Sequence, residues 1–336
     1  MLLASFFHPP ASQGVQAADV IEVTATDLAF NPENIKDRRE GRLRFVRAVQ
    51  LTSGDKRFGG LSGLRINAQG NQLLAVTDKG NWFSARLDMT GFRKPVISDA
   101  MIAPILNIDG RPLSSRAHDA EGLAFMANGG GVLVSFERWH RVWRYPVSLS
   151  SGSLRRVWQA APSPVALGPV LSHQPGNGGV EAMTMLSDGR LLLLSEKMRD
   201  DSDRDMRKGW LVTGNKPEPF DIILPGGHDP VDAATMANGD IMLLLRRYSF
   251  WSGISIKLAV LPRSELAAGR PARVKEIASL RAPRTIDNME GLAVRSGQNG
   301  RDYVYLISDD NFSPVQRTLL LMFELDPDDL PVPPVQ

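Results

Sequence analysis

The stretch DNMEGLAV, residues 287–294, places a glutamate directly against an apolar run of strand length. A carboxylate beside a buried strand costs free energy unless something compensates for it. The same arrangement recurs along the chain, with an acid in four cases and a serine in one. The five anchor positions are Ser62, Glu121, Glu181, Asp232 and Glu290. Such repetition indicates a common structural cause and therefore a repeating fold.

The spacing of the anchors predicts what kind of repeat this is. They lie 59, 60, 51 and 58 residues apart, by subtraction of their numbers. A short apolar strand follows each anchor, then a turn signal such as Asp188-Gly189 or Asn238-Gly239, then a second apolar run. Asn-Gly and Asp-Gly favour tight hairpins because both residues accept positive φ. The second runs, such as RLLLLSE at 190–196, are apolar at nearly every position and are typical of strands covered on both faces.

Two weaker strands complete most repeats, such as RVWRYPV (141–147) and LRRVWQAA (154–161) in the second, and four-stranded repeats of this length predict an all-β β-propeller. We count five blades, and six are possible because VIEVTATDLAF (20–30) could be an extra strand or part of a degenerate blade. The fifth repeat runs out of chain, so GRLRFVRAVQL (41–51) is expected to supply its outer strand and close the ring. The expected domain is a single propeller over 41–326, preceded by an extension at 19–40 and followed by a proline-rich tail at 327–336.

Composition narrows the class of protein. The net charge of +2 lacks the basic excess of a nucleic-acid binder, and no apolar run is long enough for a membrane span. The absence of cysteine excludes disulfides and cysteine-based zinc sites. Residues 1–18 resemble an atypical secretory signal, apolar and ending in small residues but without a basic start. We therefore expect a periplasmic or secreted monomer; the alternative for this segment is an uncleaved tail.

The anchors also predict a functional site. The first strand of each blade lines the channel of a propeller, so the anchors should meet at one mouth, together with the ends of the second strands. Crowded carboxylates take up protons unless a cation lies among them, and oxygen ligands without cysteine favour Ca²⁺ or Mg²⁺. We expect a divalent cation, most simply Ca²⁺, with candidate ligands Asp78, Glu121, Glu181, Asp232, Glu290 and Asp309.

Basic residues next to these acids suggest a site for an anion. Candidates to hold the anionic group of a substrate are Lys79, Arg138, Lys197, Arg246 and Arg247. Candidates for acid–base catalysis are His118, Glu137 and Glu196. A metal beside such a clamp could assist hydrolysis of a small anionic ester, such as a phosphoester. The alternative is a purely structural ring of salt bridges in a non-catalytic propeller that binds a ligand or a protein.

Other candidate sites are weaker. Ser62 lacks the G-x-S-x-G spacing of a serine esterase and is expected to complete the anchor ring. The alternating acids Asp201, Asp203 and Asp205 lack the glycine and final glutamate of a calcium loop, so we expect a solvated loop. His228 resembles His118 in preceding an aspartate. Most tryptophans are expected in blade packing, whereas Phe250-Trp251 is on a loop and could bind a ligand.

The motifs RFGGLSGL (57–64), HDAEGLAF (118–125), VEAMTML (180–186), DNMEGLAV (287–294) and LISDDNF (306–312) resemble the bacterial phytase-like family, also described by the esterase-like activity of phytase. The resemblance extends over about residues 41–326. It implies an exported propeller and a metal-dependent hydrolase. The tandem aspartate motif expected of true β-propeller phytases is absent, so the resemblance does not imply phytate hydrolysis. The ring arrangement is similar to that of calcium-dependent lactonase propellers in architecture alone.

Overall fold

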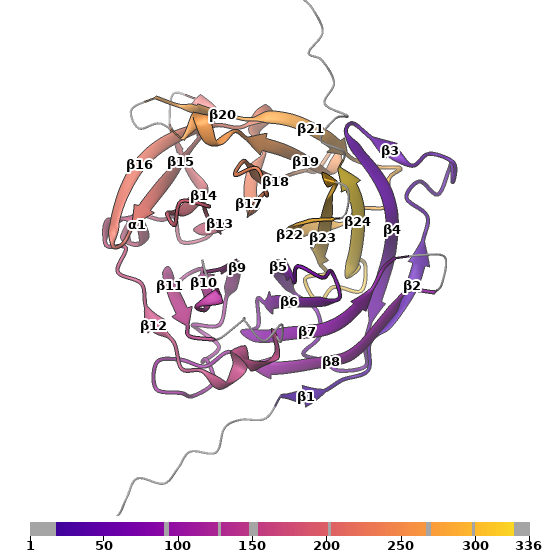
Figure 1. Ribbon diagram of the computed structural model, residues 1–336, viewed down its shortest axis with the longest axis horizontal. Coiled ribbons are helices and arrows are strands. Elements are labelled where there is room, and N and C mark those ends of the chain that lie inside the picture. Colours follow the sequence, from indigo (N-terminus) through magenta and orange to yellow (C-terminus); the bar gives the residue numbers. More distant parts are fainter. Residues whose placement is uncertain are drawn as a thin grey trace, which may run out of the picture.

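The protein is a ring of five β-sheets around a central axis (Figure 1). The computed structural model describes residues 18–90, 94–126, 129–147, 154–200, 203–266, 270–297 and 300–325. The prediction of an all-β, five-bladed propeller is confirmed. The expected signal segment, except for Ala18, and the whole proline-rich tail lie outside the described residues. Among the described residues, no helix is long and apolar enough to cross a membrane.

Each blade is an antiparallel sheet whose first strand lies nearest the channel. From the channel outward, the first blade contains β5 (Leu61–Ile66), β6 (Gln72–Thr77), β7 (Asn81–Asp88), β8 (Val96–Pro104) and β1 (Asp19–Val20). The second contains β9 (Ala120–Phe125), β10 (Val132–Phe136), β11 (Arg141–Tyr145) and β12 (Ser163–Pro164). The third contains β13 (Val180–Met185), β14 (Leu191–Asp200), β15 (Asp203–Thr213), β16 (Lys216–Ile223) and, parallel to β16, β20 (Ala272–Arg273).

The fourth blade contains β17 (Asp229–Thr235), β18 (Ile241–Ser249), β19 (Gly253–Leu261) and β21 (Lys275–Leu280). The fifth contains β22 (Asn288–Ser296), β23 (Asp302–Asp309), β24 (Leu319–Leu325), β4 (Leu43–Thr52) and β2 (Thr24–Leu28), with β3 (Arg39–Glu40) also on β4. The N-terminal strand β4 therefore pairs with β24 and closes the ring, as predicted. Segment 20–30 contributes the extra strand β2 to this blade, and no sixth blade forms in the described residues.

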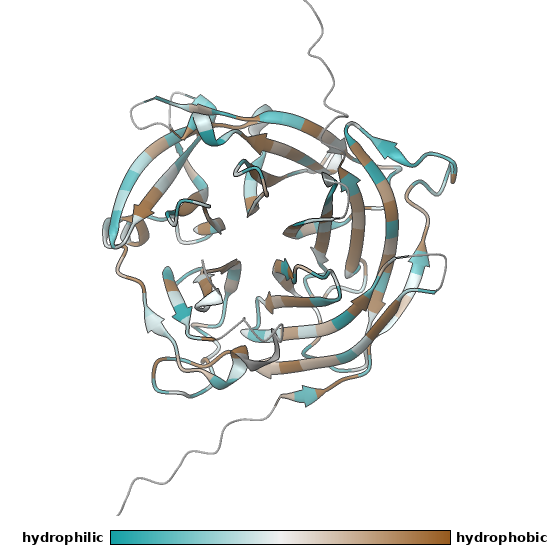
Figure 2. Cartoon of the chain, viewed as in Figure 1, coloured by the Kyte–Doolittle hydropathy of each residue, from teal (hydrophilic) through white to brown (hydrophobic). Residues whose placement is uncertain are grey.

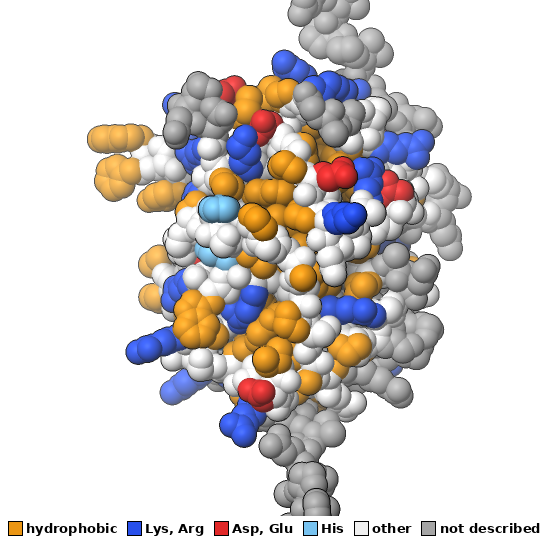
Figure 3. All heavy atoms as spheres, turned by 90° about the vertical axis from the view of Figure 1, so that its left-hand side faces the viewer, with side chains coloured by type: hydrophobic (Ala, Val, Ile, Leu, Met, Phe, Trp, Pro, Cys, Tyr) orange, Lys and Arg blue, Asp and Glu red, His pale blue; other side chains and the backbone are white. Residues whose placement is uncertain are grey.

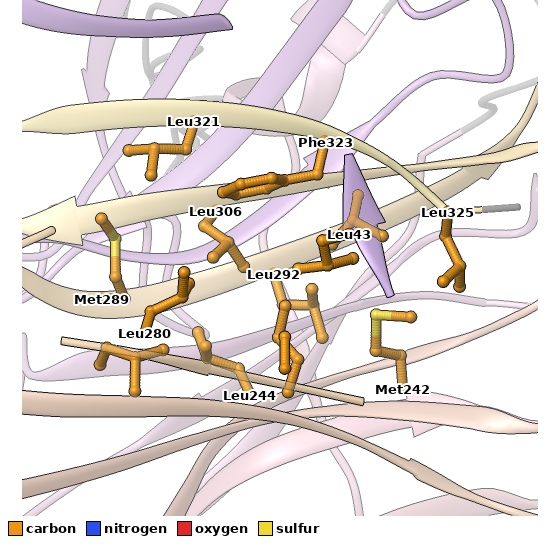
Figure 4. Packing of buried hydrophobic residues seen from close by; sticks show 14 of the residues in the cluster. Leu43, Met242, Leu244, Leu280, Met289, Leu292, Leu306, Leu321, Phe323 and Leu325 are labelled. Carbon is orange, nitrogen blue, oxygen red and sulfur yellow. The ribbon is translucent and has the colours of Figure 1, made fainter. Parts of the chain in front are cut away.

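Hydrophobic packing joins neighbouring blades. Along β6, Leu73 and Ala75 pack toward the fifth blade, whereas Leu74 and Val76 pack toward the second. Because side chains alternate along a strand, a run apolar at every position fills two interfaces at once. Figure 4 shows the interface of the fourth and fifth blades, where Met242 and Leu244 meet Leu292 and others. Figure 2 shows hydrophobic stretches along the strands of every blade, with hydrophilic residues frequent in the outer strands and loops.

One expected strand is helical instead. The segment 154–161 was predicted as an outer strand of the second blade, but it forms the 3-10 helix η3 (Leu154–Gln159). Val157 and Trp158 of this helix are buried against the first two blades, so burial is satisfied without strand pairing. The two-residue strand β12 takes the outer place. The other short helices are α1 (Pro169–Ser172), η4 (Pro225–Gly227) and η5 (Arg263–Glu265).

A buried ion pair closes the channel between the inner strands. Arg65 of β5 donates to the carboxylate of Asp232 at 3.1 Å, and the two side chains are 8% and 0% exposed. The same guanidinium donates to backbone carbonyls of Met183, Ala233 and Leu292, at 2.9–3.1 Å. Those carbonyls belong to β13, β17 and β22, so Arg65 crosses the channel and links four of its five inner strands. The mouth above this pair is therefore a basin.

Candidate functional site

The predicted mouth is a cavity of about 730 Å³ lined by all five blades. Its carboxylates come from four blades and its bases from three. The acidic lining residues are Asp78, Asp119, Glu121, Glu137, Glu181, Glu196, Glu290 and Asp309. The basic lining residues are Arg138, Lys197 and Arg246. The remainder are Asn177, Tyr248, Ile254, Asn288, Asn311, Val315 and Gln316.

β-Bulges turn the anchor side chains into this cavity. In β13, Val180 pairs with Ser195 and Ala182 with Leu194, so Glu181 has no partner across the ladder. In β22, Met289 pairs with Ser308 and Gly291 with Ile307, which leaves Glu290 unpaired in the same way. A bulge re-aims the extra side chain, and bulges are frequent beside functional sites. The repeated acid of the sequence therefore marks a repeated bulge.

Asp232 is a correction to the predicted site. In β17 the bulge lies at Val231, because Pro230 pairs with Leu245 and Asp232 with Leu244. Val231 takes the place of the anchor glutamates, and Asp232 lies one position deeper, in the ion pair with Arg65. There its carboxylate also accepts hydrogen bonds from the N–H groups of Ala233 and Leu292, both at 2.7 Å. Asp232 is thus a structural residue of the closed channel and does not line the mouth.

Most of the other candidates meet at the mouth. Of the expected metal ligands, Asp78, Glu121, Glu181, Glu290 and Asp309 line the cavity, as do the expected catalytic residues Glu137 and Glu196. Three candidates do not line it. His118 contacts the carbonyl oxygen of Asp78 through Nδ1 at 2.5 Å, Lys79 lies over the ring of Phe312, and Arg247 donates to the carbonyl of Gly226 at 3.1 Å.

The mouth has a strong excess of acid, with eight lining carboxylates against three bases. Burial raises the pKa of Glu121 and Glu181 well above the usual range, and neighbouring carboxylates add to the effect. Burial likewise raises the pKa of Glu290 to about 8, although Arg246 opposes the shift. Burial, again with help from other acids, raises the pKa of Asp309 to about 7 and that of Asp78 to about 6. The folded protein therefore favours protons, or a cation in their place, at this mouth.

The raised pKa values of the mouth carboxyls predict that the stability of the protein depends on pH. Carboxyls with a pKa raised by folding bind more protons in the folded than in the unfolded state, so stability falls as pH rises from about 4 to about 8. In chelator, we expect Tm to fall by about 5 °C or more between pH 5 and 8.5. Burial lowers the pKa of His228, which has the opposite effect, but this is one group against the five acids named above and Glu137, whose pKa burial also raises. A Tm that is constant or rises over this range would contradict the charge repulsion.

Two groups of three carboxylates offer oxygen atoms close enough to share a cation. Asp119, Glu121 and Glu137 form one group, and Glu137, Glu181 and Glu196 form the other, with ligand atoms within 4.8 Å of one another in each. Glu137 belongs to both and is positioned by the N–H groups of Gly178 and Gly179. Glu181 is 7% exposed. Neighbouring charges shift its pKa, but among the described residues none forms a hydrogen bond or an ion pair with its carboxylate. An unpartnered buried carboxylate aimed into a cavity fits a cation ligand.

Two of the three lining bases, Lys197 and Arg246, lie at the third and fourth blades. Arg246 donates to Glu290 at 2.6 Å and to Glu196 at 3.3 Å. Lys197 donates to Glu196 at 2.8 Å and to Asp229 at 2.6 Å. Asp229 is also bound by Arg199 and the fully buried Arg207, at 2.9 and 2.6 Å. The mouth therefore has a carboxylate side, from the first to the third blade, where Arg138 pairs with Asp119, and a side at the third and fourth blades where the other two bases lie among the acids.

Sequence reasoning missed Asp119 and Asn288 as site residues. Asp119 lies two positions before Glu121 and pairs with Arg138 at 2.8 Å. Asn288 lies two positions before Glu290 and donates to its carboxylate at 3.0 Å. The shared pattern of Asp or Asn, any residue, then Glu was visible in the sequence. It places two side chains on the same face of the strand before the bulge.

The weaker candidates take structural roles. Ser62 is buried and partly offsets the raised pKa of Glu121, consistent with a member of the anchor ring. Asp203 and Asp205 lie in strand β15 and not in a calcium loop, while Asp201 lies outside the described residues. His228 contacts the carbonyl of Pro225 and the hydroxyl of Ser255 and does not line the mouth.

Fold and site together define a β-propeller with a carboxylate-lined mouth. The chain belongs to the phytase-like family, whose profile, described as esterase-like activity of phytase, matches residues 56–312. This confirms the resemblance seen in the sequence. Among curated proteins, no sequence matches this chain.

Solved structures with a similar fold are distant in sequence. An α-L-arabinofuranosidase from Podospora anserina is 10% identical, with a TM-score of 0.49 over 90% of this chain and 97% of its own. An endo-arabinase from Bacteroides thetaiotaomicron is 10% identical, with a TM-score of 0.47 over 78% of this chain and 92% of its own. Likenesses this distant carry no information on what the present chain acts on.

Proposed function

We propose that this protein is a metal-dependent hydrolase of small anionic esters, with Ca²⁺ at the mouth of the propeller. The observation that carries the proposal is the pair of carboxylate groups that share Glu137, one of which contains the unpartnered Glu181. Membership of the phytase-like family supports a hydrolase. Glu121, Glu137 and Glu181, with Asp119, are the residues that would hold the cation. Hard carboxylate oxygens suit Ca²⁺, which accepts irregular sets of six to eight oxygen ligands.

In this proposal the carboxylate side of the mouth would hold the cation, and the side with Lys197 and Arg246 would hold the substrate. A bound cation would polarise the ester and lower the pKa of a water molecule. Lys197 and Arg246 would hold the anionic group of the substrate beside it. Water then adds to the acyl carbon or phosphorus, the ester bond to the alcohol oxygen breaks, and the alcohol takes up a proton. Glu196 would accept the proton of the water; its membership of one carboxylate group, beside both bases, supports this role.

The first experiment is a thermal melt of protein stripped with chelator and then titrated with Ca²⁺. Cation binding to the folded state stabilises it by about 2.7 kcal/mol at a hundredfold excess over Kd, so we expect a saturable rise in Tm of roughly 4–5 °C. Titrations with Mg²⁺ and Mn²⁺ identify the preferred ion, and NaCl at matched ionic strength is the control. A Tm that responds to NaCl as strongly as to Ca²⁺ would contradict a specific cation site.

A second candidate function is a non-catalytic binding propeller. The ion pairs of Arg246 and Lys197 with mouth acids favour it, because a structural ring of salt bridges contains the same contacts. An ester panel assayed at the preferred cation separates the two functions. A hydrolase turns over at least one phosphate or carboxylate-bearing ester, and that turnover is lost with chelator. A binding propeller shows the Tm response without any turnover.

A further inference from the structure

Exposed aromatic residues are concentrated around the mouth. Among the described residues, the four exposed aromatic side chains are Trp139, Tyr248, Phe250 and Trp251, at 62, 70, 82 and 91%. All four follow closely after mouth residues, Trp139 after Glu137 and the other three after Arg246. Single exposed apolar residues are ordinary, but three within four positions form a patch of the kind that marks a binding surface.

The patch lies on a hairpin that extends beyond the mouth. β18 and β19 remain paired as far as Ser249 and Gly253, three residues past Arg246. Tyr248 and Ile254 are cross-strand partners in this hairpin, and both line the cavity. Phe250 and Trp251 form the tip, with ring centroids 5.3 Å apart and ring planes at 87°. In Figure 3, hydrophobic side chains project from the ring at the upper left, on the face turned away from the viewer in Figure 1.

The neighbouring blade completes an apolar lip. Val315, on the loop between β23 and β24, lines the cavity and is 86% exposed. We use the name apolar lip for Tyr248, Ile254 and Val315. The lip adjoins the base-containing side of the mouth, because Arg246 and Tyr248 lie two positions apart on the same strand and both line the cavity. Two positions correspond to about 7 Å along a strand. A group attached to an anion on Arg246 would therefore lie against Tyr248.

We propose that the apolar lip is the subsite for an aromatic ring carried by the anionic ester, and that Phe250 and Trp251 extend it. This rests on the proposed function, since it supplies the substrate class for the same site. A flat ring suits Tyr248, because aromatic pairs gain free energy in offset or edge-to-face contact. The acidic basin argues against a lipid surface as occupant, because docking the mouth on a membrane would press eight carboxylates toward the headgroups. The cavity-lining position of Tyr248 likewise favours a ligand held inside the mouth.

The test uses two phosphonates that cannot be hydrolysed and that differ only in the apolar group. Isothermal titration calorimetry at saturating Ca²⁺ measures the Kd of phenylphosphonate and methylphosphonate. We expect wild type to bind phenylphosphonate about tenfold more tightly. Tyr248→Ser should abolish this preference while leaving the Kd of methylphosphonate unchanged. Trp139→Ser is the matched control, an exposed aromatic that does not line the cavity, and should change neither Kd.

Each other outcome overturns the inference in a recognisable way. Equal binding of both phosphonates by wild type removes the ring subsite but leaves the proposed anion site standing. If Tyr248→Ser weakens the binding of both phosphonates equally, then Tyr248 has a structural role and is not part of a ring subsite. If neither binds, the anion site falls and the inference falls with it. Sedimentation with phosphatidylcholine vesicles that is lost in Phe250→Ser/Trp251→Ser, without a phenyl preference, would assign the hairpin to a lipid surface instead.

Discussion

Replacement of Arg65 by leucine is expected to lower the free energy of unfolding by about 3–5 kcal/mol. The substitution leaves the carboxylate of Asp232 buried without its counter-charge, and it removes a hydrogen bond to three backbone carbonyls of other blades. Burial already raises the pKa of Asp232, and Arg65 is the main influence that opposes the shift. Removing one member of a buried ion pair is far more costly than removing both. Urea denaturation measured by tryptophan fluorescence gives the free energy.

Two variants make this prediction specific. Arg86→Leu removes an ion pair with Asp99 whose side chains are 59 and 52% exposed, and it should cost less than about 1 kcal/mol. Arg65→Leu/Asp232→Asn removes both charges of the channel, and it should be less destabilised than the sum of the single variants. A loss in Arg65→Leu no larger than in Arg86→Leu would show that the channel pair does not hold the inner strands together.

The blade count, the order of the strands and the closing strand could all be predicted from the sequence. The reason lies in the second strand of each repeat, because a run such as LLLL at 191–194 must fill two interfaces and so demands neighbours on both sides. Such a strand has few alternatives once a tight turn ties it to the strand before it. Some outer strands are less constrained: β16 buries only Phe220 and Ile222, both at one interface, and η3 replaces another outer strand at no loss of burial.

The position of Asp232 could not be predicted from the motif alone, because VDAATM looks like VEAMTM. The difference lies in the turn. Glu181 precedes the aspartate of Asp188-Gly189 by seven positions, whereas Asp232 precedes the asparagine of Asn238-Gly239 by six. Since side chains alternate along a strand, a shift of one position moves the carboxylate to another environment. Distance to the turn was therefore a better guide to the mouth than similarity around the acid.

Side-chain direction decides which of the basic residues reach the mouth, and this direction cannot be read from the sequence. Arg246 and Arg247 are adjacent, yet Arg246 enters the mouth and Arg247 faces outward to Gly226. Lys79 corresponds to Lys197 in the repeat, but it lies over Phe312, while Lys197 reaches Glu196 and Asp229. The repeat predicts where such residues occur along the ring. Contacts with loops that differ between blades decide which of them reach the cavity.

Glu181→Gln is expected to stabilise the protein in chelator and to weaken the proposed cation binding and hydrolysis. The carboxylate of Glu181 has a pKa raised by burial and by Glu196, Glu290 and Glu121, so its charged form opposes folding at neutral pH. Replacing this group by a neutral one removes that opposition, so we expect a higher free energy of unfolding at pH 8 in chelator. Glutamine keeps the shape of the side chain but is a weaker cation ligand. We therefore expect the Ca²⁺-induced rise in Tm to fall by half or more and hydrolysis to fall about 100-fold, equivalent to about 2.7 kcal/mol.

Glu324→Gln separates this effect from the loss of any buried carboxylate. Glu324 is 6% exposed, but it pairs with Arg44 and Arg301 on the outer part of the fifth blade, so its charge is compensated. Its replacement should lower stability while leaving the Ca²⁺ response intact. If Glu181→Gln also destabilises the protein in chelator and keeps the full Ca²⁺ response, then Glu181 is a structural residue. If Glu181→Gln raises stability in chelator and Glu324→Gln lowers it, then the mouth acids destabilise the fold when no cation is bound. This is the pattern expected of acids that are retained for function.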